Sequence, residues 1–277
     1  EKIMNQKEAD EIRQNVRKSY SAVAEASNTG SDCGNSSSCC GVASDEAIQT
    51  LVSTRMGYSA DDLSAVPEGA DMGLGCGNPR AIAGIQKGET VLDLGSGGGF
   101  DCFLAAAETG ESGKVIGVDM TPTMISKARE NADKGKYMHV EFRLGEIENL
   151  PVADSTIDVI ISNCVINLSP DKPRVFSESF RALKSGGRLA ISDVVASTEL
   201  PDSIREDLHL YSGCMAGAIQ ITELQAILEE AGFINISITP KDESKEFIKD
   251  WAPDKGVEEY VLSASIEAIK PASRGCC

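Results

Sequence analysis

From residue 90 onward, short apolar runs alternate with stretches in which apolar residues recur at helical spacing. Such runs are typical of buried parallel strands, and the stretches between them are typical of helices. The pattern predicts strands at 91–94, 115–119, 140–144, 157–162 and 188–193, separated by helices at 100–109, 122–133 and 173–183. This alternation predicts a doubly wound sheet whose ligands bind at the carboxyl ends of its strands.

The segment before this core contains one helix and an unusual loop. Apolar residues recur at helical spacing over 6–27, so we expect a helix there. Residues 28–41 are rich in glycine and serine, as loops are, but they also carry Cys33, Cys39 and Cys40. The chain therefore divides into an N-terminal helix and Cys-bearing loop segment at 1–86 and an α/β core at 87–200.

The pattern loosens in the remaining segment, 201–277. A helix is expected at 204–211, and a second helix should begin with a capping box at Thr222 and stop at Gly232. Closing strands are expected at 234–239 and 260–269. Earlier in the chain, Ser185–Gly187 should turn into the fifth strand.

Composition excludes several classes of protein. The 277 residues carry 43 acids and 26 bases, a net charge of −17 that disfavours nucleic acid and anionic membranes as partners. No apolar run approaches the ~20 residues of a membrane span, and the charged start lacks the core of a signal peptide. We expect a cytoplasmic protein. Nine cysteines and two histidines then favour metal, metalloid or redox chemistry over a disulfide scaffold.

A glycine-rich turn follows the first strand of the core. Gly95, Gly97 and Gly99 allow a tight turn and close approach to a ligand, but Phe100 stands where a dinucleotide-binding loop needs glycine. No Lys-Ser/Thr pair follows, so the turn is not a P-loop. Asp93 precedes the glycines, and Asp119 ends the second strand, where a carboxylate can accept both hydroxyls of a ribose. A cationic sulfonium cofactor tolerates these acids, whereas a pyrophosphate does not.

This stretch resembles the S-adenosylmethionine (SAM) methyltransferases. The resemblance implies a Rossmann-like class I fold with a seven-stranded, mostly parallel sheet, an N-terminal helical segment and a C-terminal α+β extension. It implies that Asp93, Gly95 and Gly97 hold the methionine part of SAM, that Asp119 holds the ribose, and that Asn163 lies beside the methionine end. The remaining residues expected to bind the cofactor are Ser96, Gly99, Met120, Glu146 and Ile147, of which Glu146 and Ile147 flank the adenine.

Cys164 and Cys214 fall where such an enzyme presents its substrate, and Cys76 lies just ahead of the glycine-rich turn. Soft thiolates select soft acceptors such as trivalent arsenic. The segments Gly75–Pro79, Ser162–Lys172 and Gly213–Cys214 resemble the signature segments of arsenite methyltransferases, a likeness that covers roughly residues 15–240. A zinc site is the main rival, but zinc sites usually show Cys-x2-4-Cys pairs, and none occurs here with useful spacing.

The resemblance implies a role for each thiol. Cys164 and Cys214 are the expected persistent As(III) ligands, and Cys76 is the third. Cys76 is also expected to pair with Cys39 or Cys40 during turnover, and Cys33 stays open as a further alternative. Cys102 is expected to be core packing, and the roles of the terminal Cys276 and Cys277 are open.

The chemistry implied is transfer of methyl groups from SAM to thiol-bound As(III), which detoxifies arsenic. The partners are As(III), methylated arsenicals and a thiol reductant such as thioredoxin or a glutathione-like thiol. Two alternatives stay open: methylation of a small carbon acceptor such as a quinone or sterol, and a non-catalytic module that binds metalloid or zinc. Turnover of As(III) with SAM separates the three.

Overall fold

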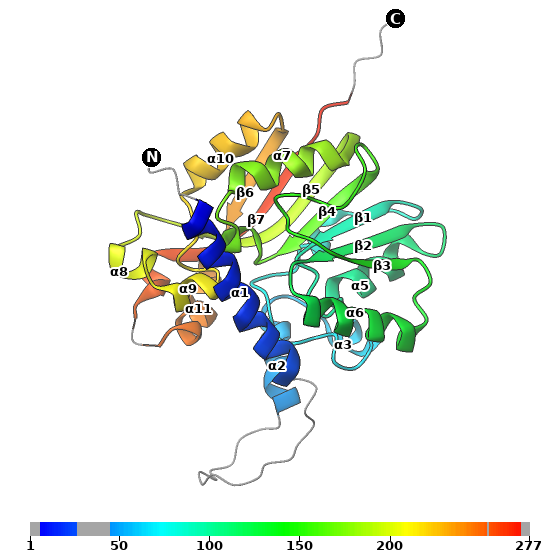
Figure 1. The fold of residues 1–277 in the computed structure, drawn as a ribbon, viewed down its shortest axis with the longest axis horizontal. Coiled ribbons are helices and arrows are strands. Elements are labelled where there is room, and N and C mark those ends of the chain that lie inside the picture. Colours follow the sequence, from blue (N-terminus) through cyan, green and yellow to red (C-terminus); the bar gives the residue numbers. More distant parts are fainter. Residues whose placement is uncertain (1–5, 27–44, 254, 273–277) are drawn as a thin grey trace, which may run out of the picture.

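The centre of the protein is one seven-stranded sheet, mostly parallel, drawn in Figure 1. The computed structural model describes residues 6–26, 45–253 and 255–272. The strand order is β3-β2-β1-β4-β5-β7-β6, with β1 to β5 parallel and β7 antiparallel to both β5 and β6. This is the predicted class I SAM methyltransferase fold. The strands are β1 (Thr90–Leu94), β2 (Lys114–Asp119), β3 (Val140–Leu144), β4 (Ile157–Asn163), β5 (Leu183–Ala196), β6 (Ile234–Pro240) and β7 (Val261–Ile269).

The apolar runs of the sequence form the middle of this sheet because both faces are covered by helices. Val91 of β1 packs in the cluster beneath α5 and α6, whereas its neighbour Leu92 packs in the cluster beneath α7 and α10. Figure 1 shows these two helix pairs on opposite sides of the sheet. The helices are α1 (Gln6–Ala26), α2 (Asp45–Arg55), α3 (Ala60–Ala65), α4 (Arg80–Ala83), α5 (Phe100–Thr109), α6 (Pro122–Gly135), α7 (Lys172–Ala182), α8 (Asp202–Arg205), α9 (Leu208–Ser212), α10 (Ile221–Glu230) and α11 (Lys245–Trp251), with 3-10 turns at Ile166–Leu168, Asp242–Ser244 and Val257–Glu259.

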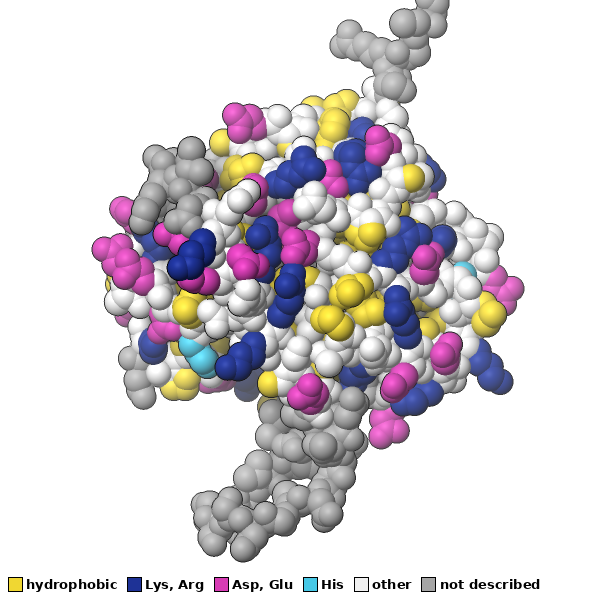
Figure 2. All heavy atoms as spheres, in the orientation of Figure 1, with side chains coloured by type: hydrophobic (Ala, Val, Ile, Leu, Met, Phe, Trp, Pro, Cys, Tyr) yellow, Lys and Arg dark blue, Asp and Glu magenta, His cyan; other side chains and the backbone are white. Residues whose placement is uncertain are grey.

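A third apolar cluster joins the N-terminal helix to the C-terminal part of the chain. Ile12 and Val16 of α1 pack with Leu210 of α9 and Ile248 of α11, so α1 crosses the molecule in front of the strands (Figure 1). Acidic and basic side chains are interspersed over this face, as Figure 2 shows. The cluster also contains the thiols of residues 76, 164 and 214. Helix α1 and the described segment after residue 200 therefore meet at the predicted substrate site.

The predicted start of the fifth strand was wrong. β5 begins at Leu183 instead of residue 188, and the expected turn at Ser185–Gly187 lies within the strand. Ile157 of β4 pairs with Leu183, but the next pair is Val159 with Arg188, so the extra residues form a bulge. Gly186 makes the bulge sterically cheap because its φ is +81°.

Two helix predictions after residue 200 also need correction. The expected helix at 204–211 is broken into α8 and α9, because the carboxylate of Asp207 accepts hydrogen bonds from the backbone N–H groups of His209 and Leu210 and starts a new helix. The capping box at Thr222 does not form: α10 begins at Ile221, with Gln220 at the N-cap and no side-chain cap. Helix α11 was not predicted.

The segment 201–277 is built into the same sheet as the core. Its strands β6 and β7 complete the edge beyond β5. The division into 1–86, 87–200 and 201–277 stays a prediction about organisation along the chain. In the part of the chain that the structure describes, no helix combines the length and apolarity that crossing a bilayer requires.

Phe176 is the most direct test of the core. Its side chain is fully buried in the cluster beneath α7 and α10. Phe176→Ala should lower the free energy of unfolding by about 3–5 kcal/mol, because it removes buried apolar surface and leaves a cavity. Urea denaturation measures this loss. The same change at the half-buried Phe247 should cost much less, and equal losses in the two variants would contradict the packing described.

Candidate active site

A cavity of about 440 Å³ opens at the carboxyl ends of β1, β2 and β4. Side chains of α1, α9 and α11 also line it, so it lies where the third apolar cluster meets the sheet. Of the predicted cofactor residues, the cavity wall contains Asp93, Gly95, Ser96, Gly97, Asp119, Met120, Ile147 and Asn163. The predicted cofactor residues therefore lie largely together, as expected at this edge of a doubly wound sheet.

The glycine turn has positive φ angles and packs closely against a neighbouring side chain. Gly95 has a φ of +74°, and a Cβ there would lie 2.3 Å from Cγ2 of Val165. Gly97 has a φ of +50°, and its N–H donates to Oδ2 of Asp119 at 3.0 Å. At residue 95 only glycine can adopt the positive φ and also leave room for the side chain of Val165. The hydroxyl of Ser96 is buried without a hydrogen-bond partner among the described residues, so it is available to a ligand.

Asp119 is fixed at the end of β2. Besides the bond from Gly97, its Oδ1 accepts the backbone N–H of Thr121 at 2.8 Å. Burial raises the pKa of this carboxyl, and the two backbone donors act against that shift. The carboxylate lies in the cavity wall with lone pairs left over, as a ribose acceptor requires.

Two further carboxyls lie side by side under the glycine turn. Asp93 accepts a hydrogen bond from the thiol of Cys102 at 3.2 Å, so Cys102 is buried core, as predicted, and also supports this acid. Asp101 accepts from the hydroxyl of Tyr58 at 2.6 Å. Burial raises the pKa of Asp93 well above its usual range, with a smaller contribution from the charge of Asp101. Burial also raises the pKa of Asp101 to about 6.

The cavity as a whole is acidic. Its described wall carries one arginine, Arg13, and five carboxyls: Asp71, Asp93, Asp101, Asp119 and Glu148. Closely spaced buried acids disfavour one another's charge, and a cation between them removes that cost. The wall therefore fits a cationic ligand and does not fit a pyrophosphate. With the glycine turn and the unpartnered Ser96 hydroxyl, these acids meet the needs of SAM, whose sulfonium and ammonium groups are positive.

Two predicted cofactor residues lie elsewhere. Glu146 is not in the cavity wall: its carboxylate forms an ion pair with Arg17 of α1, and Arg13 lies 3.7 Å away. Gly99 caps the start of α5 with a φ of +94°, behind the wall. A sequence motif gives the direction of a strand end but does not show which of its side chains will pair with a helix from elsewhere in the chain, such as α1.

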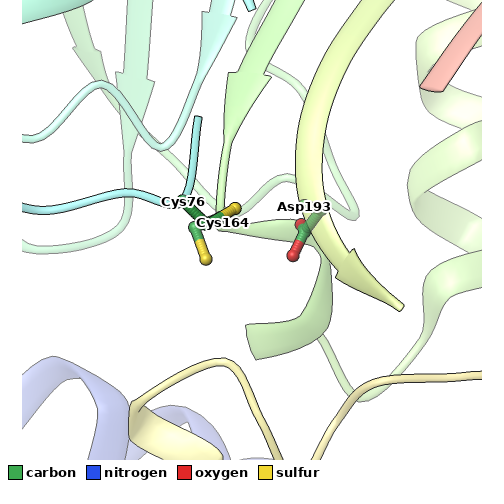
Figure 3. Close-up of side chains that lie close together, drawn as sticks. All are labelled: Cys76, Cys164 and Asp193. Carbon is green, nitrogen blue, oxygen red and sulfur yellow. The ribbon is translucent and has the colours of Figure 1, made fainter. Parts of the chain in front are cut away.

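Three buried thiols meet at the other end of the cavity. Cys76 is 1% exposed, Cys164 7% and Cys214 3%, and all three are free thiols. The sulfur atoms of Cys76 and Cys164 and a carboxylate oxygen of Asp193 lie within 4.8 Å of one another (Figure 3). Cys164 and Cys214 line the cavity itself. Cys76 lies behind them.

The backbone at two of these thiols is unusual. Cys164 has a φ of +59° and Cys214 a φ of +63°, a region that residues other than glycine seldom occupy. Such strain clusters at functional sites because the surrounding structure must enforce it. Asp193 holds the turn that follows Cys164: its carboxylate accepts from the backbone N–H of Ile166 at 2.8 Å and from the side chain of Asn167 at 2.8 Å.

Cys214 completes the set from the C-terminal segment. Its thiol donates to the carbonyl oxygen of Cys164, so the two residues are in direct contact. Hydrogen bonding with Cys214 and Cys76 raises the pKa of the Cys164 thiol, and burial adds to this shift. In this structure, at least one pair among the three sulfur atoms is more than 4.8 Å apart. A three-coordinate ion therefore needs a short inward movement of one of them.

The comparisons with known proteins agree with this geometry. A family model described as a methyltransferase domain matches residues 85–232. The arsenite methyltransferase of Halobacterium salinarum is 53% identical over 98% of this chain. The chain belongs to the arsenite methyltransferase family.

The likeness extends to more distant members and to a solved structure. The human arsenite methyltransferase is 42% identical over 52% of this chain. A crystal structure of an arsenic(III) SAM methyltransferase from Chlamydomonas reinhardtii has a TM-score of 0.59 and 34% identity, covering 81% of this chain and 74% of that one. The chain spans 70% of the Halobacterium protein but only 40% of the human one.

Sequence reasoning missed several groups in this arsenite methyltransferase site. Tyr20 of α1 lines the cavity and donates to the carbonyl of Ser212 at 3.3 Å, two residues before Cys214. Tyr58, Asp101 and Glu148 were also missed: Asp101 directly follows the glycine turn, but none of the three belongs to a motif that marks it as a cavity residue. Cys33, Cys39, Cys40, Cys276 and Cys277 lie outside the described residues.

Gly95→Ala tests the geometry of the glycine turn. The added methyl group must displace Val165 or the turn itself, so SAM affinity should fall about 5- to 150-fold, which corresponds to an overpacking cost of roughly 1–3 kcal/mol. Titration calorimetry measures the affinity. Gly186→Ala is the matched control, because Gly186 has a similar φ of +81° but no atom within 4 Å of its added Cβ. Equal SAM affinity in the two variants would rule out the close approach at Gly95.

Proposed function

We propose that this protein transfers the methyl group of SAM to As(III) held by Cys76, Cys164 and Cys214. One observation carries the proposal: Cys164 and Cys214 line the same acidic cavity as the glycine turn, and Cys76 lies directly behind Cys164. Family membership supports the activity. The thiol set is supported by this burial and proximity, and by the preference of soft thiolates for a soft, three-coordinate acceptor.

The cofactor end is assigned to the acids and the glycine turn. Asp119 accepts the ribose hydroxyls, Gly95 and Gly97 allow the backbone to approach, and Asp93 faces the methionine part. The Ser96 hydroxyl supplies a further polar contact. When bound, SAM supplies an electrophilic methyl group next to a positive sulfur atom.

The arsenic end works through positioning. Three thiolates satisfy the valence of As(III) and leave its lone pair free to attack the methyl carbon. No general base is required, because arsenic carries no proton that must be removed. Cys164 and Cys214 belong to the cavity wall, so arsenic bound there faces the methyl donor. The rate gain then comes mainly from fixed orientation and exclusion of water.

Methyl transfer uses the arsenic lone pair and so leaves arsenic formally pentavalent. Return to As(III) takes two electrons, which two thiols supply when they form a disulfide. Cys76 and Cys39 or Cys40 are our candidates, with Cys33 as a further alternative, and an external thiol such as thioredoxin then reopens the disulfide. The products are methylated arsenicals. We also propose a cytoplasmic location, where such thiols stay reduced.

Asp119→Ala tests the cofactor assignment. The change removes a carboxylate that makes two charge-assisted contacts to the ribose, so SAM binding should weaken by about 2–4 kcal/mol. Calorimetric titration with SAM measures the effect. Asp154→Ala removes the same charge from an exposed side chain and should leave the affinity unchanged. Unaltered SAM affinity in Asp119→Ala would exclude this residue from the ribose site.

Cys164→Ser and Cys214→Ser test the activity and the thiol set together. A hydroxyl is too hard a ligand for As(III), so each variant should lose arsenite binding and methylation but keep SAM binding. The assay is incubation with arsenite, thiol and SAM, followed by arsenic speciation. Cys102→Ser is the matched control, because this buried cysteine lies outside the thiol set. The hydroxyl of the substituted serine can still donate to Asp93, as the thiol of Cys102 does.

The same assay separates the alternatives. The proposal is supported if wild type and Cys102→Ser produce methylated arsenic and Cys164→Ser and Cys214→Ser do not. Arsenite binding without SAM turnover in the wild type would indicate a non-catalytic metalloid module. A wild type that neither binds nor methylates arsenite would favour a small carbon acceptor.

A further inference from the structure

The side-chain amide of Asn163 clamps the Cys76 loop against the end of β4. Its Oδ1 accepts the backbone N–H of Cys76 at 3.0 Å, and its Nδ2 donates to the carbonyl of Gly77 at 2.8 Å. Asn163 directly precedes Cys164 in the chain. One amide therefore sets the position of the Cys76 backbone relative to Cys164, although the two cysteines are far apart in sequence.

The clamp fits tightly on both sides of residue 76. A Cβ at Gly75 would lie 2.7 Å from the amide of Asn163, so this glycine lets the loop reach the clamp. On the opposite side, the hydroxyl of Ser263 donates to the carbonyl of Cys76 at 2.7 Å. A shift of the loop relative to Cys164 must therefore break or re-aim the bonds of the Asn163 amide or the bond from Ser263.

Tyr58 and Asp101 decide how that amide is turned. The Tyr58 hydroxyl donates to Oδ1 of Asp101 at 2.6 Å, which leaves its oxygen to accept from Nδ2 of Asn163 at 3.0 Å. Oδ2 of Asp101 lies 3.4 Å from the same Nδ2. The Tyr58 ring is 3% exposed and packs edge-on against Phe100 at a centroid distance of 4.8 Å. Burial and packing against Phe100 therefore hold the Tyr58 side chain in place within this series of hydrogen bonds.

The far end of this chain of contacts reaches the cofactor side of the cavity. Asp101 lies in the first turn of α5, directly after the glycine turn, and its side chain belongs to the cavity wall beside Asp93. Asp71 and Arg80 are the other charged groups that act on it. A cation bound in this acidic corner faces Asp93 and Asp101 together.

We propose that Tyr58 and Asp101 are positioning residues that couple occupation of the cofactor site to the placement of Cys76, so that methyl donor and As(III) bind cooperatively. The inference rests on the proposed function. A positive cofactor group stabilises Asp101 as a carboxylate, which is a stronger acceptor for the Tyr58 hydroxyl than a neutral acid. The hydroxyl then presents its lone pair to Asn163 in one fixed direction. The amide in turn holds Cys76 close to Cys164.

This coupling must act in both directions. If a bound cofactor tightens As(III) binding by some factor, bound As(III) tightens the cofactor by the same factor. A purely structural contribution of Tyr58 behaves differently: its loss weakens As(III) binding equally with and without the cofactor. The ratio of the two affinities is therefore the diagnostic quantity.

The experiment measures As(III) affinity with and without saturating S-adenosylhomocysteine, which fills the cofactor site without turnover and keeps the methionine ammonium. Trp251 is the single tryptophan and lines the cavity, so its fluorescence reports binding. In the wild type, S-adenosylhomocysteine should tighten As(III) binding about tenfold, and the reverse titration should give the same factor. In Tyr58→Phe the factor should fall to within about twofold of one, while each ligand alone still binds.

Tyr137→Phe is the matched control. Its hydroxyl donates to the carbonyl of Ala65 at 3.2 Å, outside the cavity wall, so the wild-type factor should be retained. Asp101→Asn is the second variant, because it keeps the shape of the side chain but removes the charge that responds to the cofactor. It should lose the coupling as Tyr58→Phe does.

The outcomes are distinct. Loss of the factor in both site variants, with the control unchanged, supports the inference. A wild type that binds both ligands and methylates arsenite but shows no coupling overturns it and leaves the proposed function intact, as does full coupling in a folded Tyr58→Phe or Asp101→Asn. A wild type that binds no As(III) overturns the inference together with the proposed function.

Discussion

The site depends on one constraint: the central strand β4 ends in an amide and a thiol on consecutive residues. Asn163 holds the Cys76 loop, and Cys164 leaves the strand with a left-handed backbone, followed by a turn that the carboxylate of Asp193 holds at Ile166. Because β4 lies between β1 and β5, the glycine turn that follows β1 is its immediate neighbour. Methyl donor and thiols therefore meet at one strand end.

Charge explains why one acidic cavity can hold both the methyl donor and the acceptor. A sulfonium donor is positive, and a thiol-bound As(III) acceptor carries no proton that a base must take. The wall consequently has no need of a catalytic base, and its five carboxyls instead favour a cationic cofactor. The same acids carry a cost in the empty protein, since burial raises the pKa of Asp93, Asp101 and Asp119. Binding of a cation relieves this cost.

Much of the fold could be predicted from the sequence because the strands of a doubly wound sheet are apolar on both faces. The helix at 100–109 and the strand at 140–144 have the predicted bounds. The predictions failed where a single local contact decides the structure. Asp207 breaks the helix expected at 204–211, and a bulge at Gly186 lengthens β5.

In the candidate site too, residues that belong to a motif could be predicted, whereas residues brought together by a single contact could not. Glycines and acids at fixed positions after strands are visible in sequence, and the predicted Gly95, Gly97 and Asp119 lie in the cavity wall. Asn163 was expected beside the methionine, and the structure shows it in the cavity wall and bound to the Cys76 loop. Tyr58 and Asp101 are 43 residues apart and belong to no motif, so only the folded chain brings them together. Glu146, predicted to flank the adenine, lies outside the cavity wall and pairs with Arg17 of α1, a contact that its neighbours in sequence do not indicate.

X-ray absorption at the arsenic edge, on wild-type protein loaded with one equivalent of As(III), measures the central claim most directly. If Cys76, Cys164 and Cys214 close around the ion, the spectrum will show three sulfur neighbours and no oxygen, and the Cys164→Ser and Cys214→Ser variants will retain no bound As(III). Two sulfurs and an oxygen in the wild type, or three sulfurs that persist in the Cys214→Ser variant, would contradict a site built from these three thiols.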